Sequence, residues 1–440
     1  MKRIIFTLTF LSCIHLTYCQ PETSRDVLHL HKALEIVKDN NLTLKQQVER
    51  INQATRELHI QKAGLFPKIF ANGSYNFISE IPKLKLVGTP IDISAGANNQ
   101  YDINIQIQQP IFTGFRSLNL IKAANEDLKI KRSHSRSILN QILYQIHNIF
   151  YSAQLNQLQQ KVLQASLERA HKDLTTTINF YEAAQISAFD TLRVANQYLD
   201  IITHLNRLTH EYEVILTQLA VVLNLSDVKE VQPFSETEFT LSLESVDTYT
   251  DMAFKNRPEL TEIYHKIRSQ GYFKKSINAF YFPQVHGQAS YHYGKPGVNF
   301  FENKWMDYFT IGLNLHWEIW NMGRRKNQIE QTKYAINILT IEQEKILDIV
   351  KKEVKQAYEN LLTDIDQIAL TEQLFIQEKE RYRIINEKYN QGLATTLDLT
   401  EAENALTTAE LRLQQNKINW LIDNAYMKFV CGQLDMDLSQ

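Results

Sequence analysis

The chain has 440 residues and a formal net charge of −2, with 47 lysines and arginines against 49 aspartates and glutamates. This balance implies no polyanionic partner, and no basic stripe supports nucleic-acid binding. The length would hold two or three ordinary domains. A long internal repeat, described below, indicates one duplicated unit instead.

The first 19 residues have the features of a secretory signal peptide. Lys2-Arg3 precedes an apolar run over residues 4–16, which is too short for a transmembrane helix. Cleavage after Cys19 would leave residues 20–440 as a single mature domain, and lipidation of Cys19 is the alternative. Cys431 would then be the last cysteine, so no intrachain disulfide is expected.

An internal repeat organises the rest of the chain. Asn40–Leu44 with Pro67 returns as Asn256–Leu260 with Pro283, at an offset of 216 residues (283 − 67). Further along the chain, Asp190 matches Asp398 at an offset of 208 residues (398 − 190). The second copy is therefore eight residues shorter before this point, and we expect the missing residues to come from the loop between the paired strands. The period is too long for a solenoid. The expected units are repeat 1 over about 28–225, repeat 2 over about 247–432, and an equatorial belt over about 226–246 and 433–440.

Four short runs alternate strictly between apolar and polar residues, over about 68–79, 100–111, 284–294 and 308–319. Such alternation gives a strand one apolar and one polar face. The runs have about the length of a membrane-spanning β-strand, roughly 9–11 residues. We expect the apolar faces to contact lipid, mainly through Ile103, Ile105, Ile107, Tyr291, Ile311, Leu313 and Leu315.

A soluble, half-buried sheet is the ordinary explanation for any one such run. Here four runs carry polar faces of Gln, Asn, Ser and His, which suit a water-filled lumen. Four strands cannot close a barrel, and an open edge in lipid leaves backbone groups unpaired. Further copies must therefore complete the sheet, and three copies of four strands would give twelve. Export together with such strands indicates the outer membrane of a Gram-negative bacterium.

Long segments without proline or glycine follow the strands, from Arg116 to about Phe180 and from Arg324 to about Tyr389. At about 1.5 Å per residue each would span roughly 100 Å. A short break and a second helix with a heptad seam follow each segment. The second seam is weaker because Asn416 and Asp423 interrupt it. The expected fold class is mainly α, built from duplicated helical hairpins, with a small membrane β component.

Several motifs resemble those of the TolC-like outer-membrane efflux proteins, in order and in duplicate. The stretch Tyr389–Glu403, YNQGLATTLDLTEAE, resembles the family's Y-x-x-G-x-x-T-x-x-D motif at the hairpin tip. Asn256–Leu260 resembles its N-x-P-x-L signature. Ile319–Arg325 resembles the family's strand-to-helix turn motif, and Ile111–Arg116 matches the same motif less closely.

The resemblance implies a homotrimer with a 12-stranded barrel in the outer membrane and an α-helical tunnel in the periplasm. It implies the exit duct of a tripartite efflux or type I secretion system, which meets a periplasmic adaptor protein and an inner-membrane pump of RND or ABC type. It implies neither catalysis nor a cofactor. Two alternatives stay open at this point: a structural or adhesive trimeric coiled coil at the cell surface, and a periplasmic enzyme.

The resemblance also assigns a gate. Asp398 matches an aspartate that lines the tunnel entrance, and Glu401 follows one turn later, so three copies would present rings of carboxylates that favour cations. A helix cap is the alternative role for Asp398. Tyr389 and Asp190 match a gate-holding hydrogen-bonded pair, while Ala394 replaces the family's arginine. The tip residues expected to meet the adaptor are Ala184, Ser187, Gly392 and Thr395.

Other chemistry is sparse. His286, His292 and His316 share the polar strand faces and could approach one another in the lumen. A metal site there is a weaker expectation than a polar lining. No glycine-rich phosphate loop or serine–histidine–aspartate pattern stands out, so no metal site and no catalytic site is assigned.

Overall fold

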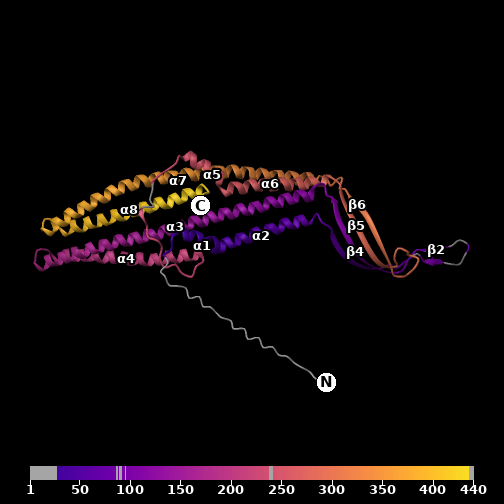
Figure 1. Cartoon of the computed structure of the whole chain (residues 1–440), viewed down its shortest axis with the longest axis horizontal. Helices are drawn as coiled ribbons and strands as arrows, with labels where there is room; N and C mark the ends of the chain where they lie inside the picture. Colours follow the sequence, from indigo (N-terminus) through magenta and orange to yellow (C-terminus); the bar gives the residue numbers. More distant parts are fainter. Residues whose placement is uncertain (1–26, 86–87, 89–91, 95, 237–240, 436–440) are drawn as a thin grey trace, which may run out of the picture.

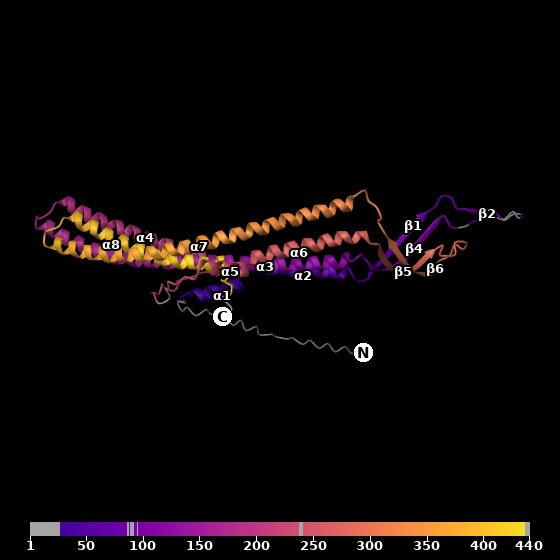
Figure 2. The ribbon, with the colours of Figure 1, turned by 90° about the horizontal axis from the view of Figure 1, so that it is seen from above.

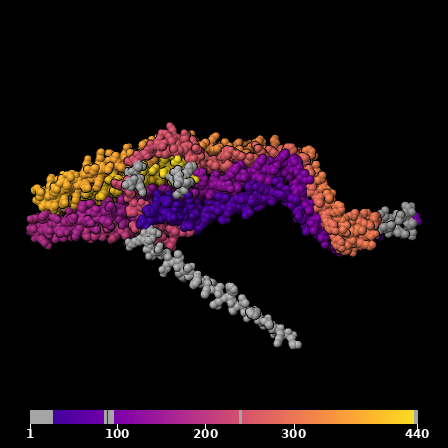
Figure 3. Space-filling view, viewed as in Figure 1, coloured from indigo at the N-terminus to yellow at the C-terminus, as the bar shows by residue number. Residues whose placement is uncertain are grey.

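The computed structural model describes residues 27–85, 88, 92–94, 96–236 and 241–435. The expected signal peptide, Cys19 and the last five residues lie outside this part. Within it, long helices lie side by side and the strands gather at one end (Figure 1). Seen from a second direction, the helices keep this arrangement and the strands continue beyond them (Figure 2). The space-filling view shows one continuous, elongated molecule whose strand end bends away from the helices (Figure 3).

The two copies share one order of elements: two helices, two long strands, a long helix and a return helix. The first consists of α1 (Leu30–Asn40), α2 (Leu42–Ala63), β1 (Lys68–Phe77), β2 (Lys83–Lys85), β3 (Asp92–Ser94), β4 (Asn99–Phe112), α3 (Arg116–Glu182) and α4 (Ala188–Leu223). The second consists of α5 (Val246–Asn256), α6 (Pro258–Asn278), the 3-10 turn η2 (Ala279–Tyr281), β5 (Gln284–Lys295), β6 (Met306–His316), α7 (Arg324–Asn390) and α8 (Thr396–Val430).

Element bounds reproduce both sequence offsets. β5 starts 216 residues after β1 (284 − 68), and α7 starts 208 residues after α3 (324 − 116). The change of register falls between the paired strands, where the first copy inserts the small β2–β3 hairpin and the second has only a short loop. Mainly helical structure with one four-stranded sheet confirms the expected fold class.

The larger sheet is antiparallel with the order β1-β4-β5-β6. The expected run over 308–319 is wrong at its end, because β6 stops at His316. His316 pairs with Gln284, the first residue of β5. Pro283 precedes Gln284 and has no N–H to extend the ladder. Beyond His316 the chain therefore leaves the sheet.

Apart from the bulge between Pro110 and Phe112, strand register places the odd-numbered residues on one face. Ile105 lies between Ala71 of β1 and Tyr291 of β5, and Tyr291 lies opposite Phe309 of β6. This face is largely apolar and exposed in the single chain, with Ile105 56% and Ile311 77% exposed. A sheet that exposes so many large apolar side chains requires an apolar surrounding.

The opposite face is polar, but its histidines do not gather. His292 lies six residues along β5 from His286, which corresponds to roughly 20 Å. It contacts Asp102, with Nδ1 3.0 Å from Oδ1, and stacks on Tyr308. His316 lies opposite Gln284, at the same end of the sheet as His286 and far from His292. A shared site for the three histidines is therefore wrong, and the described residues contain no group of three or more potential metal ligands.

Two left-handed residues turn the chain from each strand pair into a long helix. They are Gly114 and Phe115 in the first copy (φ 62° and 67°) and Met322 and Gly323 in the second (φ 54° and 77°). A Cβ atom on Gly114 would lie 2.4 Å from the carbonyl oxygen of Ala279, so this position requires glycine. Each turn leads directly into a helix of 67 residues.

The long helices and their return helices form two hairpins, α3–α4 and α7–α8, which pack together mainly through α3 and α8. The α8 seam is buried at the expected heptad positions, including Leu399, Leu406, Leu413 and Val430. Near the middle of the molecule, a parallel bridge joins Leu28 to Val231 and brings the belt segment against the helices. Across the described residues, none of the helices is both long and apolar enough to span a bilayer.

Candidate functional site at the hairpin tips

Both hairpin tips have the same backbone geometry. Ala184 and Gly392 adopt left-handed conformations (φ 58° and 72°) just after α3 and α7. The next N–H turns back onto the helix in each case, from Gln185 to the carbonyl of Phe180 and from Leu393 to the carbonyl of Lys388, at 2.9 and 2.8 Å. This is a common helix C-terminal motif, which favours glycine. Ala184 therefore holds a strained conformation that Gly392 adopts freely.

The return helices start with matching capping boxes. Ser187 and Thr395 are the N-caps of α4 and α8, and Asp190 and Asp398 are the acidic partners three residues later. The Thr395 hydroxyl donates to Oδ2 of Asp398 at 2.7 Å, and its backbone N–H donates at 2.9 Å. These two bonds lower the pKa of Asp398.

The capping alternative for Asp398 is thus present in the structure. Its carboxylate is nevertheless exposed, and so is Glu401 one turn later. A carboxylate that caps its own helix with one oxygen still carries its full charge at the tip. Capping and a role in a charged entrance are therefore compatible.

Tyr389 and Asp190 do not bond to each other, which corrects the expected pairing. The Tyr389 side chain is buried, 2% exposed, and its hydroxyl lies 2.8 Å from Oγ1 of Thr177. Thr177 uses its own proton for a backbone carbonyl of α3, so Tyr389 is the donor. Asp190 instead accepts from the Thr396 hydroxyl at 2.5 Å.

The physical reason is that the Tyr389 side chain is buried between the hairpins, whereas the Asp190 side chain lies at the N-terminal end of α4. The ring of Tyr389 packs inward, edge-on to Phe180 of α3, and burial raises the pKa of its hydroxyl. Asp190 stays at the surface, where its own N-cap and then Thr396 lower the pKa of its carboxyl. Both residues still join the two hairpins, but through Thr177 and Thr396.

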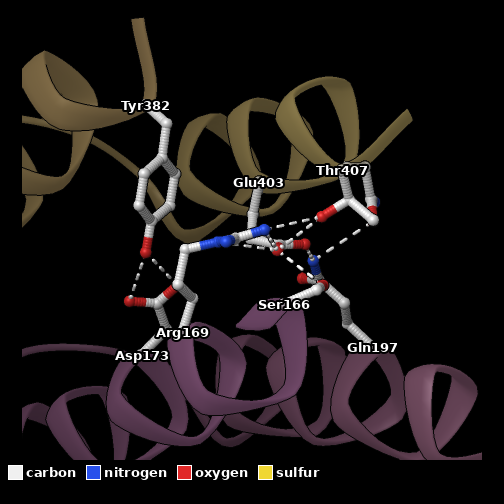
Figure 4. Close-up of polar contacts among 8 residues, drawn as sticks. Ser166, Arg169, Asp173, Gln197, Tyr382, Glu403 and Thr407 are labelled. Carbon is white, nitrogen blue, oxygen red and sulfur yellow. Dashed lines mark hydrogen bonds and ion pairs between the residues drawn. The ribbon is translucent and has the colours of Figure 1, made fainter. Parts of the chain in front are cut away.

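A buried carboxylate forms the centre of a larger network between the hairpins. Glu403 of α8 is 1% exposed. Its Oε1 accepts from Ser166 at 2.7 Å and from Arg169 Nη2 at 3.1 Å, both on α3. Gln197 of α4 donates to Oε2 at 3.0 Å, and Thr407 donates to Oε1 at 2.8 Å. Figure 4 shows these groups converging from both hairpins.

The network continues from Arg169 toward the tips. The Arg169 guanidinium lies over the ring of Tyr382, 5.8 Å from its centroid. The Tyr382 hydroxyl donates to Asp173 at 3.2 Å (Figure 4). Burial raises the pKa of Asp173 to about 6, against the opposing effect of the Tyr382 hydrogen bond. Polar contacts thus connect α3 with α7 and α8 over several helical turns.

Sequence reasoning assigned no role to Glu403, Arg169 or Tyr382. Glu403 directly follows the seam residue Ala402, so it lies beside the α7–α8 seam and reaches α3 instead. A charged residue next to a heptad seam can indicate that the helix also contacts a second helix beside the seam. Its partner on α3 lies 234 positions away and carries no recognisable motif.

A match to a protein-family model identifies the family. The "Outer membrane efflux protein" model matches residues 33–225 and 250–433, one segment in each copy. Together they cover most of the chain.

Curated relatives match over most of their length at low identity. The outer membrane efflux protein BepC of Brucella suis is 23% identical over 91% of this chain and 86% of its own length. The probable efflux pump outer membrane protein TtgC of Pseudomonas putida is 21% identical over 87% and 78%. The alkaline protease secretion protein AprF of Pseudomonas aeruginosa is 18% identical over 77% and 70%.

Solved structures share the fold. CusC superposes with a TM-score of 0.80 at 12% identity, covering 92% of each chain. VceC of Vibrio cholerae gives 0.76 at 16% identity, over 92% of this chain and 96% of its own. A duplicated pair of helical hairpins with a four-stranded sheet, the matched family model and these neighbours lead to one conclusion. The chain belongs to the outer membrane efflux protein family, as its resemblance to the TolC-like proteins predicted, and acts as a channel in the outer membrane of a Gram-negative bacterium.

Proposed function

We propose that three copies of this chain assemble into one duct, with a twelve-stranded barrel in the outer membrane and a helical tunnel in the periplasm. The observation that carries this proposal is the open sheet. β1 and β6 are its edges, and within the described residues neither edge has a partner beyond the sheet. An open edge in lipid leaves N–H and C=O groups unpaired, so neighbouring copies must pair with both edges.

The two faces of the sheet fit this assembly. The exposed apolar face, with Ile103, Ile107, Leu313 and Leu315 among its residues, would contact lipid. The opposite face, with the row Asn104, His292 and Tyr308, would line a water-filled lumen. Residues 226–236 and 241–246, with the chain end at 433–435, would form a belt around the tunnel.

The hairpin tips are the proposed periplasmic end. Ala184, Ser187, Gly392 and Thr395 lie at the turns and would meet a periplasmic adaptor protein. An inner-membrane pump of RND or ABC type would complete the system. Rings of Asp398 and Glu401 would form the entrance and favour cations. The Glu403 network would hold the two hairpins together above it.

Efflux is the favoured use of the duct, because the relatives named for efflux, BepC and TtgC, match at 23% and 21% identity. Protein secretion is a second candidate, supported by the match to AprF. Expression in two strains separates them, one lacking its efflux duct and one lacking its protease-secretion duct. Restored drug resistance indicates efflux, and restored export of the protease indicates secretion.

The assembly itself is tested on the detergent-extracted protein. Its mass should correspond to three chains, and the purified complex should conduct ions across a planar bilayer. A monomer in mild detergent that inserts into bilayers as a monomer would overturn the proposal. Cross-linking between cysteines placed on β1 and β6 should join different chains, not the two edges of one chain.

A further inference from the structure

Two successive polar layers interrupt the otherwise apolar seam between α7 and α8. In one layer Asn416 donates to the Thr371 hydroxyl at 3.3 Å. Asp364 lies seven residues before Thr371, and Asp423 lies seven residues after Asn416. Because α7 and α8 are antiparallel and share a heptad seam, this spacing makes Asp364 and Asp423 the next layer. Two carboxyl groups therefore face each other across the seam.

The surroundings of this pair are apolar. Asp364 is only 7% exposed. Leu361 and Ile368 lie one turn to either side of it on α7, and Trp420 and Met427 lie one turn to either side of Asp423 on α8; all four belong to one buried cluster. Asp423 is half-buried, and no neighbouring cation lowers the pKa of either carboxyl. Two negative charges would therefore lie together in largely apolar surroundings.

The hydrogen bonding of the pair is incomplete when both groups are ionised. Two carboxylates can only accept, and Oδ2 of Asp364 is buried without a donor. The charge of Asp423 acts on Asp364, and Asp364 is the hydrogen-bonding partner of Asp423. The other titratable groups near Asp423 are the phenols of Tyr144 on α3 and of Tyr426 on α8 itself, and both stay neutral at physiological pH.

We propose that Asp364 and Asp423 share one proton, and that loss of this proton to water separates α7 from α8 at this layer. The shared proton supplies the donor that Asp364 lacks, so one carboxylic acid bonds to one carboxylate. After deprotonation two unpaired negative charges remain in an apolar seam. The second hairpin thus contains a joint that loosens as the pH of the periplasm rises.

The first hairpin lacks this device. At the offset of 208 residues, Asp364 corresponds to Asn156 and Asp423 to Ile215; the neighbouring layer corresponds to Leu163 and Leu208. Asn156 is buried and accepts a hydrogen bond from Gln160 at 2.6 Å. No group in these two layers titrates. Only the second copy therefore has a pH-sensitive layer at this position. Any effect of this layer on the entrance of the channel rests on the proposed function as a duct.

The direction of the pH effect follows from burial. Desolvation and then the charge of Asp423 raise the pKa of Asp364 to about 7, and desolvation raises the pKa of Asp423. The folded pair holds its proton more tightly than the unfolded chain does. Its stabilisation is therefore complete below the ordinary carboxyl range, near pH 4, and is lost as the pH rises toward about 7.

Hydrogen exchange on the full-length assembled protein tests the joint. Protection factors, corrected for intrinsic exchange, are compared between about pH 5 and about pH 8 for segments 357–371 and 416–430. We expect the opening constant of these segments to rise with pH, by up to tenfold per pH unit below about pH 7. The matching segments of the first hairpin, 149–163 and 208–222, serve as the internal reference and should change little.

Variants separate titration from packing. Asp364→Asn should abolish most of the pH dependence, while Asn416→Leu alters the other polar layer and should keep it. The infrared carbonyl component of the protonated pair should disappear as the pH rises. In Asp364→Asn this component should be missing, while the component of Asp173 remains. Two results would overturn the proposal: protection factors that do not change with pH in the wild type, or the same pH dependence in Asp364→Asn as in the wild type. Because these readouts do not use conductance, failure of the duct proposal would leave them unchanged.

Discussion

Replacing Arg169 by methionine tests whether the buried network holds the hairpins together. The change removes the cation next to Glu403, which is 1% exposed and keeps only neutral donors from Ser166, Gln197 and Thr407. Loss of one partner of a buried ion pair typically costs about 3–5 kcal/mol. Because three donors remain, we expect the lower end of that range, about 3 kcal/mol.

The matched control removes both charges. In the double variant Arg169→Met with Glu403→Met, no unpaired charge stays buried, and such replacements are often close to neutral. The single and double variants, with Glu403→Met alone, form a double-mutant cycle. We expect Arg169→Met alone to be more harmful than the double variant.

Hydrogen exchange is the suitable assay, because an assembled membrane protein is not expected to unfold in two states. A loss of about 3 kcal/mol corresponds to a rise of roughly a hundredfold in the local opening constant. This rise should appear in segments 160–177 and 399–413. Segment 258–278 of α6 lies outside the network and should stay unchanged. Equal opening in the single and double variants would refute the assigned role of the ion pair.

Three further changes test other parts of the molecule. Ala184→Gly should raise the free energy of local unfolding by about 1 kcal/mol, because it relieves a left-handed alanine; no gain in thermal stability of the helical signal would contradict this. Ile105→Arg should make the free energy of membrane insertion and assembly less favourable by about 2–4 kcal/mol, while Gln106→Arg on the polar face should be tolerated better. Equal assembled fractions of the two variants in membrane extracts would contradict the assignment of faces. Asp398→Ala with Glu401→Ala should lower cation selectivity in the planar bilayer, and an unchanged reversal potential in asymmetric salt would reject the carboxylate rings.

The two copies differ at the hairpin turn and in the seam between the long helix and the return helix. Ala184 and Gly392 adopt the same left-handed turn, but only the glycine does so without strain. Asp364 and Asp423 occupy a seam that is uncharged in the first copy. The first hairpin is therefore the more uniform coiled coil, and the second contains the interrupted layers.

Local signals in the sequence predicted the four strands of the larger sheet, the two long helices and their duplication, but not the β2–β3 hairpin. Alternation with a period of two residues predicts a strand, and it also predicts which residues share a face, as Ile105 and Gln106 illustrate. Proline-free and glycine-free segments predicted the two long helices. A cap at Thr395 or Thr396, with Asp398 in the first turn, predicted the start of α8. These signals are local, because each depends on residues within a few positions of one another.

Only the tertiary structure decided which side chains meet across elements. Tyr389 bonds to Thr177 and not to Asp190, because its ring is buried against α3. Glu403 meets Arg169 across 234 positions of sequence. The end of β6 depended on the first residue of its partner strand, β5. Such contacts depend on the register and rotation of two helices or strands relative to each other, and no local pattern in either segment specifies that geometry.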